Sequence, residues 1–329
     1  LICACLTLSA CNYPPSHSES QVQADVVDSA LKDLESPRVT PVVEPEREAF
    51  EAIKKLPTPE IYEAEIADLC ESIGAKLGSV SVDDCHALQM QSSGIVSAEQ
   101  RPLAIREFVP AGDTLSRGRV LVIGGIHGDE YSSVSIVFKW MTQLKKDTDN
   151  ALHWRFMPSV NPDGLLVRKS TRQNANGVDL NRNFPSSDWD SLAIDYWHSK
   201  ASSSPRRNPG KQSASESETR GLMAQIEAFK PDVIVSIHAP YHLLDYDGPL
   251  NPPAQIGDLH LHELGVYPGS LGNYAGSDLQ LPVVTLELPY AGIMPKPASI
   301  ADMWSDLNLW LSKELSSHKQ GATQVLSRN

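Results

Sequence analysis

Four short apolar runs, separated by amphipathic segments, constrain the fold of this chain more than any other feature. The runs cover residues 119–126 (RVLVIGGI), 152–160, 233–237 and 283–288. Their length and composition are typical of strands that are buried on both faces of a sheet. Strands that alternate with helices predict an α/β domain, with a mixed, mostly parallel central sheet flanked by helices.

Amphipathic helices are expected between and after these runs. Apolar residues recur at helical spacing over 134–144 and again over 300–310, where the second helix is predicted to start from a capping-box pattern at Ser299. A third helix is predicted over 215–229, because a Lys-Pro pair follows it. The stretch 186–219, rich in Ser, Pro, Arg and Trp, is predicted to be a long surface loop that borders a site.

The charge balance excludes one class of function. The 329 residues include 41 acidic and 28 basic side chains, which gives a net charge of −13 at pH 7. Sequence-independent binding of nucleic acid needs basic residues that neutralise phosphates, so no nucleic-acid partner is expected. With 21% charged and 41% hydrophobic residues, the composition also excludes a disordered protein.

The first eleven residues predict export. Residues 1–10 (LICACLTLSA) are apolar and uncharged, which suits the hydrophobic region of a signal peptide and is too short to span a bilayer. They end in Leu8-Ser9-Ala10-Cys11, which resembles a bacterial lipobox with Cys11 as the lipidated residue. We expect a periplasmic lipoprotein of the bacterial cell envelope that contacts the membrane only through a lipid anchor at Cys11. An ordinary secretory signal with an incidental cysteine is the alternative.

The chain is expected to have four segments. They are a signal-peptide remnant (1–10), a flexible tether rich in Pro, Ser and Glu (11–56), one catalytic domain (57–316) and a polar tail (317–329). Outside the signal and the lipidation site, only Cys70 and Cys85 remain. They form either one disulfide in an oxidising periplasm or two buried thiols.

Histidine and carboxylate side chains follow two of the predicted strands. His127 and Glu130, in the GGIHGDE segment, come directly after the first run, and His238 follows the run 233–237. Ligands gather at the carboxyl ends of strands in open α/β sheets. Two imidazoles and a carboxylate suit a catalytic zinc ion, which keeps three protein ligands and one open position. A His-x-x-Glu pair alone is common by chance, so further motifs must decide.

Three further motifs complete a specific pattern. NPDG (161–164) follows the second run, GVDLNRNFP (177–185) lies downstream, and Glu287 lies within the last run. In the order HGDE, NPDG, GVDLNRNFP, SIHAP and TLELP, the sequence resembles the M14 zinc carboxypeptidases, and within them the bacterial murein peptide amidases. The resemblance covers roughly residues 70–315 and implies one zinc-carboxypeptidase-like domain with one Zn²⁺ per chain.

The resemblance also implies a role for each motif residue. The three zinc ligands would be His127, Glu130 and His238. Glu287 would be the general base that takes a proton from the zinc-activated water and passes it to the leaving amine. Asn181 and Arg182 would hold the free carboxylate of the substrate. Arg172 would stabilise the oxyanion, with Arg168 as a rival for that role.

The specificity pocket is the least defined part of the resemblance. The tyrosine that lines this pocket in digestive members of the family would be Tyr267 or Tyr274, and either could instead be ordinary packing. The segment 268–276 is expected to help form the pocket. It carries no evident side chain that would select a basic or an aromatic terminal residue.

The function implied is hydrolysis of peptidoglycan-derived stem peptides between γ-D-glutamate and meso-diaminopimelate. The alternative is a general metallocarboxypeptidase that removes C-terminal L-amino acids from peptides, since both share the zinc ion, the base and the carboxylate clamp. A deacylase resembling aspartoacylase would share the three zinc ligands, but NPDG together with NRNFP opposes it. A wall-binding module without catalysis is opposed by the presence of every expected catalytic residue type.

Overall fold

A computed structural model describes residues 59–110, 116–147 and 149–326 of the protein. The chain divides into two compact units, 1–56 and 57–329, and every described residue belongs to the second. The expected signal (1–10), the lipidation site Cys11 and the tether therefore lie outside the described residues. Within the described ranges, none of the helices has the length and hydropathy needed to cross a bilayer.

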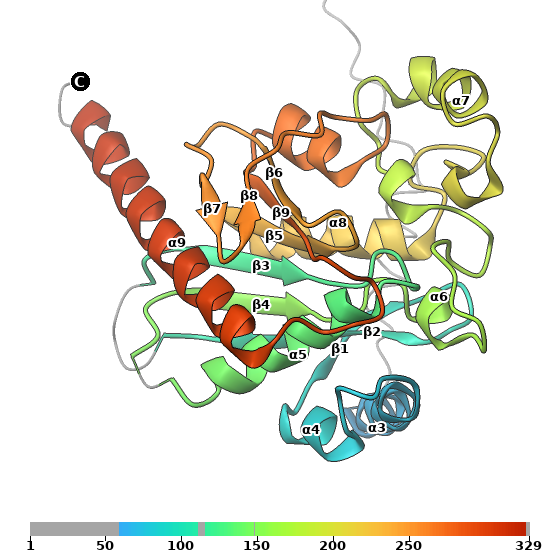
Figure 1. Ribbon diagram of the computed structural model, residues 1–329, viewed down its shortest axis with the longest axis horizontal. Coiled ribbons are helices and arrows are strands. Elements are labelled where there is room, and N and C mark those ends of the chain that lie inside the picture. The colour runs from blue at the N-terminus through green and yellow to red at the C-terminus, as the bar shows by residue number, and fades with distance from the viewer. Residues whose placement is uncertain (1–58, 111–115, 148, 327–329) are drawn as a thin grey trace, which may run out of the picture. The chain divides into compact units, whose positions relative to one another are not determined.

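A seven-stranded mixed sheet forms the centre of the described unit (Figure 1). In spatial order its strands are β1 (Gln91–Val96), β2 (Pro102–Phe108), β4 (His153–Met157), β3 (Arg119–Ile123), β5 (Val233–His238), β9 (Val283–Glu287) and β6 (Leu243–Asp247). The middle strands β4, β3, β5 and β9 are parallel to one another, whereas β1, β2 and β6 are joined antiparallel. The predicted α/β fold with a mixed sheet and a parallel centre is confirmed.

Helices connect and cover these strands. They are α3 (Pro59–Lys76), α4 (Val82–Ala87), α5 (Tyr131–Leu144), α6 (Pro162–Leu166), α7 (Trp189–Ser199), α8 (Ser217–Phe229) and α9 (Pro297–Leu326). The short helical turns are η1 (Leu180–Arg182), η2 (Pro205–Arg207) and the π-helical η3 (Gly272–Asp278). A small hairpin pairs β7 (Gln255–Ile256) with β8 (Leu259–His260). Helices α5 and α8 match the predicted helical segments.

The expectation that 186–219 is a surface loop is wrong for much of its length. It contains α7 and η2 and the first residues of α8. Trp189 and Ala193 lie one helical turn apart and are both buried, so this segment has an apolar face that a loop would not need. The stretch rich in Ser and Pro thus forms a packed helical excursion.

Helix α9 also differs from its expected limits. It begins at Pro297 rather than at a cap on Ser299, because the fixed φ of proline suits the first turn of a helix. It continues through Leu326, so the backbone of residues 317–326, expected within a polar tail, is helical.

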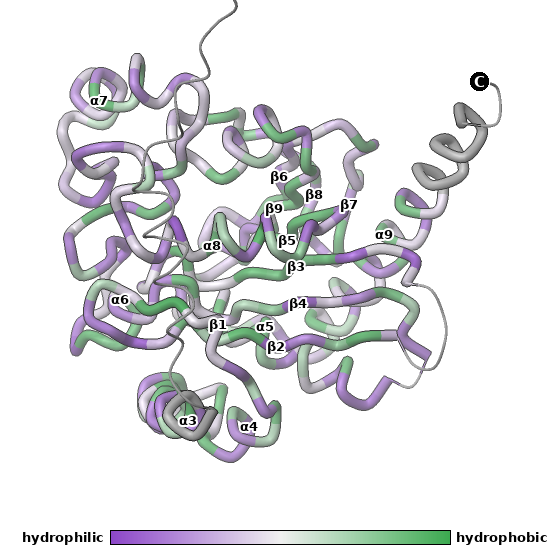
Figure 2. Tube along the Cα trace, turned by 180° about the vertical axis from the view of Figure 1, so that it is seen from behind, coloured by the Kyte–Doolittle hydropathy of each residue, from purple (hydrophilic) through white to green (hydrophobic). Residues whose placement is uncertain are grey.

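The central strands β3 and β5 are buried on both faces, as the apolar runs predict. In β3, Val120 and Val122 point to the side covered by α5 and α9, whereas Leu121 and Ile123 point to the side covered by α8. The hydrophobic colour follows these central strands in Figure 2. Burial on both sides fixes the register of each strand, because a shift by one residue would exchange the two faces.

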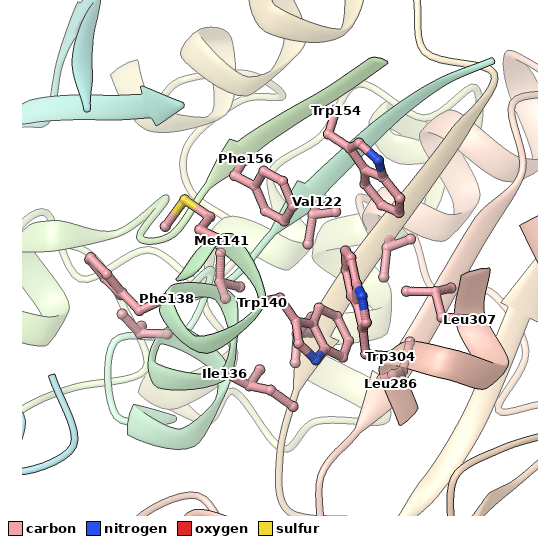
Figure 3. Packing of buried hydrophobic residues seen from close by; sticks show 14 of the residues in the cluster. Val122, Ile136, Phe138, Trp140, Met141, Trp154, Phe156, Leu286, Trp304 and Leu307 are labelled. Carbon is pink, nitrogen blue, oxygen red and sulfur yellow. The ribbon is translucent and has the colours of Figure 1, made fainter. Parts of the chain in front are cut away.

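Three tryptophans pack the first of these two cores. Figure 3 shows Trp304 of α9 lying beside Trp140 of α5 and Trp154 of β4. The ring centroid of Trp304 lies 5.3 Å from that of Trp140 and 5.1 Å from that of Trp154. Aromatic contacts at these distances contribute about 0.5–1.5 kcal/mol beyond the area they bury, and here they join the C-terminal helix to the sheet.

Cys70 of α3 and Cys85 of α4 form a disulfide. Both are buried in the first core. Of the two alternatives that the sequence left open, the structure therefore has the disulfide rather than two thiols.

Candidate metal and active site

The segment between β3 and α5 carries the first pair of predicted ligands. The chain leaves β3 after Ile123, and α5 begins at Tyr131, so Glu130 immediately precedes the helix. Gly128 packs against the NPDG turn, where an added Cβ would collide with the backbone of Gly164. The glycine of HGDE thus allows the two turns to approach each other.

The asparagine of NPDG holds this arrangement together. Oδ1 of Asn161 accepts a hydrogen bond from the backbone N–H of Gly164 at 2.8 Å. Its Nδ2 donates to the carbonyl oxygens of Ile126 and Arg172, each at 3.2 Å. Asn161 is fully buried, so it fixes the HGDE turn relative to the segment that carries Arg172.

Three metal-binding side chains converge at the carboxyl edge of the sheet. Nδ1 of His127 lies 2.8 Å from Oε1 of Glu130, and Nδ1 of His238 lies 3.2 Å from Oε2 of the same carboxylate. The two Nδ1 atoms are 3.2 Å apart, and one donor atom from each residue lies within 4.8 Å of the others. Two ring nitrogens and a buried carboxylate aimed at one point fit a single metal ion, and His₂Glu is a zinc donor set.

Outer hydrogen bonds orient the two imidazoles. Nε2 of His127 lies 3.2 Å from Oδ1 of Asp179, and Nε2 of His238 lies 3.1 Å from Oγ of Ser236. Each ring therefore turns its Nδ1 toward the centre of the cluster, as the ligands of bound metals do. Burial alone would raise the pKa of Asp179, but Arg172 and His127 hold it well below its ordinary value, so this group stays a carboxylate.

Glu287 faces the cluster from β9. It lies opposite His238 in the register of β5 and β9 and is 7% exposed. Its Oε2 is buried and has no hydrogen-bond partner among the described residues. Burial raises the pKa of Glu287 above its ordinary value, against the lowering effect of His238. A raised pKa suits a carboxylate that takes up and returns a proton.

Of the two arginines considered for the oxyanion, only Arg172 has its side chain at the cluster. Its Nε donates to Oδ2 of Asp179 at 2.8 Å, and its Nη1 lies 3.1 Å from Nδ1 of His127 and 3.7 Å from Glu130. Arg168 is exposed and does not line the cavity. The geometry therefore favours Arg172 for this role.

A second half-buried cation lies near Arg172. The guanidinium of Arg182 lies over the ring of Tyr267, 4.7 Å from its centroid, and Nη1 donates to the carbonyl oxygen of Asn181 at 2.6 Å. In the described part of the chain, no carboxylate forms an ion pair with Arg182. Burial lowers the pKa of Arg182, as do the nearby cations Arg172 and Arg207, against the raising effect of the Asp179 carboxylate. An arginine in this state gains from an anionic ligand.

The two candidate tyrosines have different surroundings. Tyr267 lines the cavity and carries Arg182 on its ring. Tyr274 stacks on Phe184, with ring centroids 5.7 Å apart, in the second hydrophobic core. Tyr274 is therefore a packing residue, and Tyr267 is the tyrosine of the pocket.

All of the predicted site residues line one cavity of about 680 Å³. They are His127, Glu130, Arg172, Asn181, Arg182, His238 and Glu287. The segment predicted to border the site does so, because Lys200, Arg206 and Arg207 line the same cavity. Ser270 and Gly272, from the segment expected to form the pocket, also contribute to its wall.

Comparison with known proteins identifies the family. A family model described as zinc carboxypeptidase, Peptidase M14, matches residues 86–252, just over half of the chain. The chain belongs to the M14 zinc carboxypeptidase family. It is therefore a zinc metallopeptidase, a hydrolytic enzyme, and the buried His-Glu-His cluster is the group that could hold its one metal ion.

Relatives of this M14 peptidase include bacterial amidases. It is 36% identical over 186 residues to murein peptide amidase A of Escherichia coli strain K12, covering 53% of this chain and 72% of the relative. The corresponding protein of Vibrio campbellii is 32% identical over 184 residues, covering 53% and 71%. The crystal structure of carboxypeptidase A from Helicoverpa armigera shares the fold, with a TM-score of 0.55 at 16% identity over 91% of this chain and 88% of that one.

Three acidic residues in or behind the cavity of this M14 peptidase were not predicted as site residues from its sequence. Asp179 lies inside the GVDLNRNFP motif and contacts His127 from behind the cavity wall, fully buried. Asp245 and Asp247 of β6 line the cavity itself. The alternation of apolar and acidic residues in LLDYD (243–247) is the signal that could have indicated a strand with one polar face.

Proposed function

We propose that this chain hydrolyses peptidoglycan stem peptides at the bond between γ-D-glutamate and meso-diaminopimelate. The observation that carries the proposal is one cavity in which Arg182, which forms no ion pair among the described residues, lies beside the three-donor cluster and the unpartnered Oε2 of Glu287. Such a cavity suits a peptide with a free carboxylate next to the scissile bond. The similarity to murein peptide amidases supports murein peptides as the substrate class.

The proposed metal ligands are Nδ1 of His127, the carboxylate of Glu130 and Nδ1 of His238. Burial alone would raise the pKa of Glu130, but His127 and His238 lower it below its ordinary value, so a carboxylate is available as ligand. A bound zinc ion would polarise the scissile carbonyl and lower the pKa of water at this site.

Glu287 is proposed to move the proton. Its unpartnered Oε2 would accept a proton from the attacking water and then return it to the nitrogen of the leaving diaminopimelate. The register that places Glu287 opposite His238 holds the base beside the metal donors throughout this exchange.

The two half-buried arginines, Arg172 and Arg182, are proposed to bind different negative charges. Arg172, next to His127 and held by Asp179, would stabilise the oxyanion that develops on the scissile carbonyl. Arg182 and the side-chain amide of Asn181 would bind the carboxylate of the residue to be released. Oδ1 of Asn181 accepts from the backbone N–H of Leu271 at 2.8 Å, which orients its amide group.

We further propose that the chain is an exported lipoprotein held at the membrane through Cys11. The lipobox-like Leu8-Ser9-Ala10-Cys11 supports this location. The disulfide between Cys70 and Cys85 also favours an oxidising compartment outside the cytoplasm. A lipid anchor in the bacterial envelope would keep the enzyme near its polymer.

The test is a direct comparison of substrates. The purified, zinc-loaded chain is incubated with L-Ala-γ-D-Glu-meso-diaminopimelate and, separately, with ordinary L-peptides, and the products are read by mass spectrometry. Release of free diaminopimelate that a chelator abolishes is the expected result. Cleavage of L-peptides alone would replace the proposal by a general carboxypeptidase, and cleavage of neither would remove both.

A further inference from the structure

Strand β6 presents a row of polar side chains to the cavity. Leu244 and Tyr246 point into the first hydrophobic core, whereas Leu243, Asp245 and Asp247 line the cavity. This is the alternation expected of a strand that covers a core with one face. The edge of the sheet therefore places two carboxylates in the substrate cavity.

Along β6, Asp245 lies two residues from Leu243, which is the residue opposite the proposed base, Glu287. In the register of β6 and β9, Leu243 lies opposite Glu287 and Asp245 lies opposite Thr285. Glu287 and Thr285 both line the cavity, two residues apart on the same face. At the ordinary rise of a strand, the row of Asp245 is about 6–7 Å from the row of Glu287.

Within the described ranges, no basic side chain forms an ion pair with Asp245 or Asp247. Oδ1 of Asp245, which is 7% exposed, accepts a hydrogen bond from the backbone N–H of Leu264 at 2.9 Å. Asp247 has neither a hydrogen bond nor an ion pair with any described side chain. It is held in place by packing, since a Cβ added at Gly272 would collide with its carboxylate.

The environment of the pair is unfavourable for two negative charges. Burial, together with the nearby charges of Asp245 and Glu263, raises the pKa of Asp247 to about 6. Burial also raises the pKa of Asp245. Buried carboxylates that lack a counter-charge are stabilised when a ligand brings a cation to them.

Independent observations show that this cavity is built for a ligand. Among the residues that the structure describes, Glu287, 93% buried, has an oxygen atom without a partner on the same wall, and Arg182 is a cation without an ion pair. The cavity thus offers a site for an anionic group at Arg182 and a site for a cationic group at Asp245 and Asp247.

We propose that Asp245 and Asp247 select the substrate by binding an ammonium group on the side chain of its C-terminal residue. This inference rests on the proposed function. In meso-diaminopimelate, four C–C bonds of about 1.5 Å separate the carbon next to the scissile amide from the carbon that bears the second ammonium, about 5 Å in extended form. That span is comparable with the separation between the Glu287 row and the Asp245 row. A terminal residue without the ammonium leaves both carboxylates uncompensated.

The test compares two peptides that differ only in this ammonium. One is L-Ala-γ-D-Glu-meso-diaminopimelate, and the other ends in L-2-aminopimelate, which keeps both carboxylates and carries hydrogen in place of the distal amino group. The zinc-loaded full chain is expected to prefer the first peptide by about tenfold to a hundredfold in kcat/KM, the range of a charge-assisted hydrogen bond.

Two conservative variants test whether Asp245 and Asp247 cause this preference. Asp245→Asn and Asp247→Asn are each expected to reduce the preference at least about tenfold, chiefly through a higher KM for the diaminopimelate peptide. The aminopimelate peptide should be cleaved as well as before or better, which a merely structural defect would not produce. Asp258→Asn, an exposed aspartate outside the cavity, is the matched control.

The possible outcomes separate this inference from the proposed function. If the wild type cleaves neither peptide, the proposed function is wrong. If it cleaves both equally, or if both variants keep the wild-type preference, the peptidase assignment stands and the ammonium site is wrong. The comparison of peptides on the wild type remains decisive even if a variant fails to fold.

Discussion

His238 and Glu287 lie opposite each other in the register of the parallel strands β5 and β9. Each is the last residue of its strand, so a proposed metal ligand and the proposed base are set by backbone pairing in the centre of the sheet. Groups held by packed strands keep their separation better than groups on loops, and proton transfer requires that separation to be short.

Replacing the base tests this relationship. Glu287→Gln keeps the size of the side chain but removes its ability to accept a proton. We expect kcat on the murein tripeptide to fall at least about a hundredfold, with KM and bound zinc little changed. Steady-state kinetics measure kcat and KM, and metal analysis measures the bound zinc. Glu227→Gln, on the exposed face of α8, is the control. Unchanged turnover would contradict the mechanism.

Arg182 is expected to determine the requirement for a free terminal carboxylate. Arg182→Met should lower kcat/KM about tenfold to a hundredfold on peptides with that carboxylate, because a charge-assisted hydrogen bond is lost. On peptides whose terminal carboxylate is amidated, Arg182→Met should leave kcat/KM unchanged. Rates on the two peptide types measure the difference, with the exposed Arg168→Met as control. Equal losses on both would show that Arg182 acts only through the fold.

Asp179 is expected to tune the metal site through His127. Asp179→Asn removes the charge that faces Nε2 of His127, and zinc affinity should fall about tenfold to a hundredfold. Competition with a chelating dye measures this affinity. Asp163→Asn is a matched control, since Asp163 is equally buried but binds Ser97 and Arg101 instead. Equal zinc affinities in both variants would contradict the expectation.

Asp247 should make the stability of the fold depend on pH. Its folded-state pKa of about 6 lies above the ordinary value of 3.8. The favourable contribution of Asp247 to the free energy of unfolding is therefore fully present below about pH 4, where the carboxyl group is protonated. That contribution is lost as the pH rises through about 6. Asp247→Asn should therefore add about 1–2 kcal/mol at pH 7.5, after allowance for screening by solvent, and almost nothing near pH 4.

Thermal unfolding at the two pH values measures this effect. The gain at pH 7.5 should appear as about 2–4 °C in Tm for each kcal/mol. Asp68→Asn, an exposed aspartate on α3, should show no such pH-dependent gain. An increase of the same size at both pH values would mean that the charge of Asp247 is not its cause.

Much of the sheet could be predicted because its central strands are largely apolar. Every residue of β5 and four of the five residues of β3 and of β9 are buried, whereas β4 alternates between buried residues and the half-buried His153 and Arg155. Strands β1, β2 and β6 were not predicted. They are partly exposed and mix polar with apolar residues, as in the LLDYD of β6.

The sequence by itself determined the residue types at the strand ends and their order along the chain. That was enough to predict the family, the three metal donors and the base, because each is attached to an element with a strong local pattern. Tertiary structure alone placed Arg172 rather than Arg168 at the cluster, paired Cys70 with Cys85 and turned the acidic face of β6 into the cavity. Those outcomes depend on register and on packing between segments far apart in the chain, which no local pattern encodes.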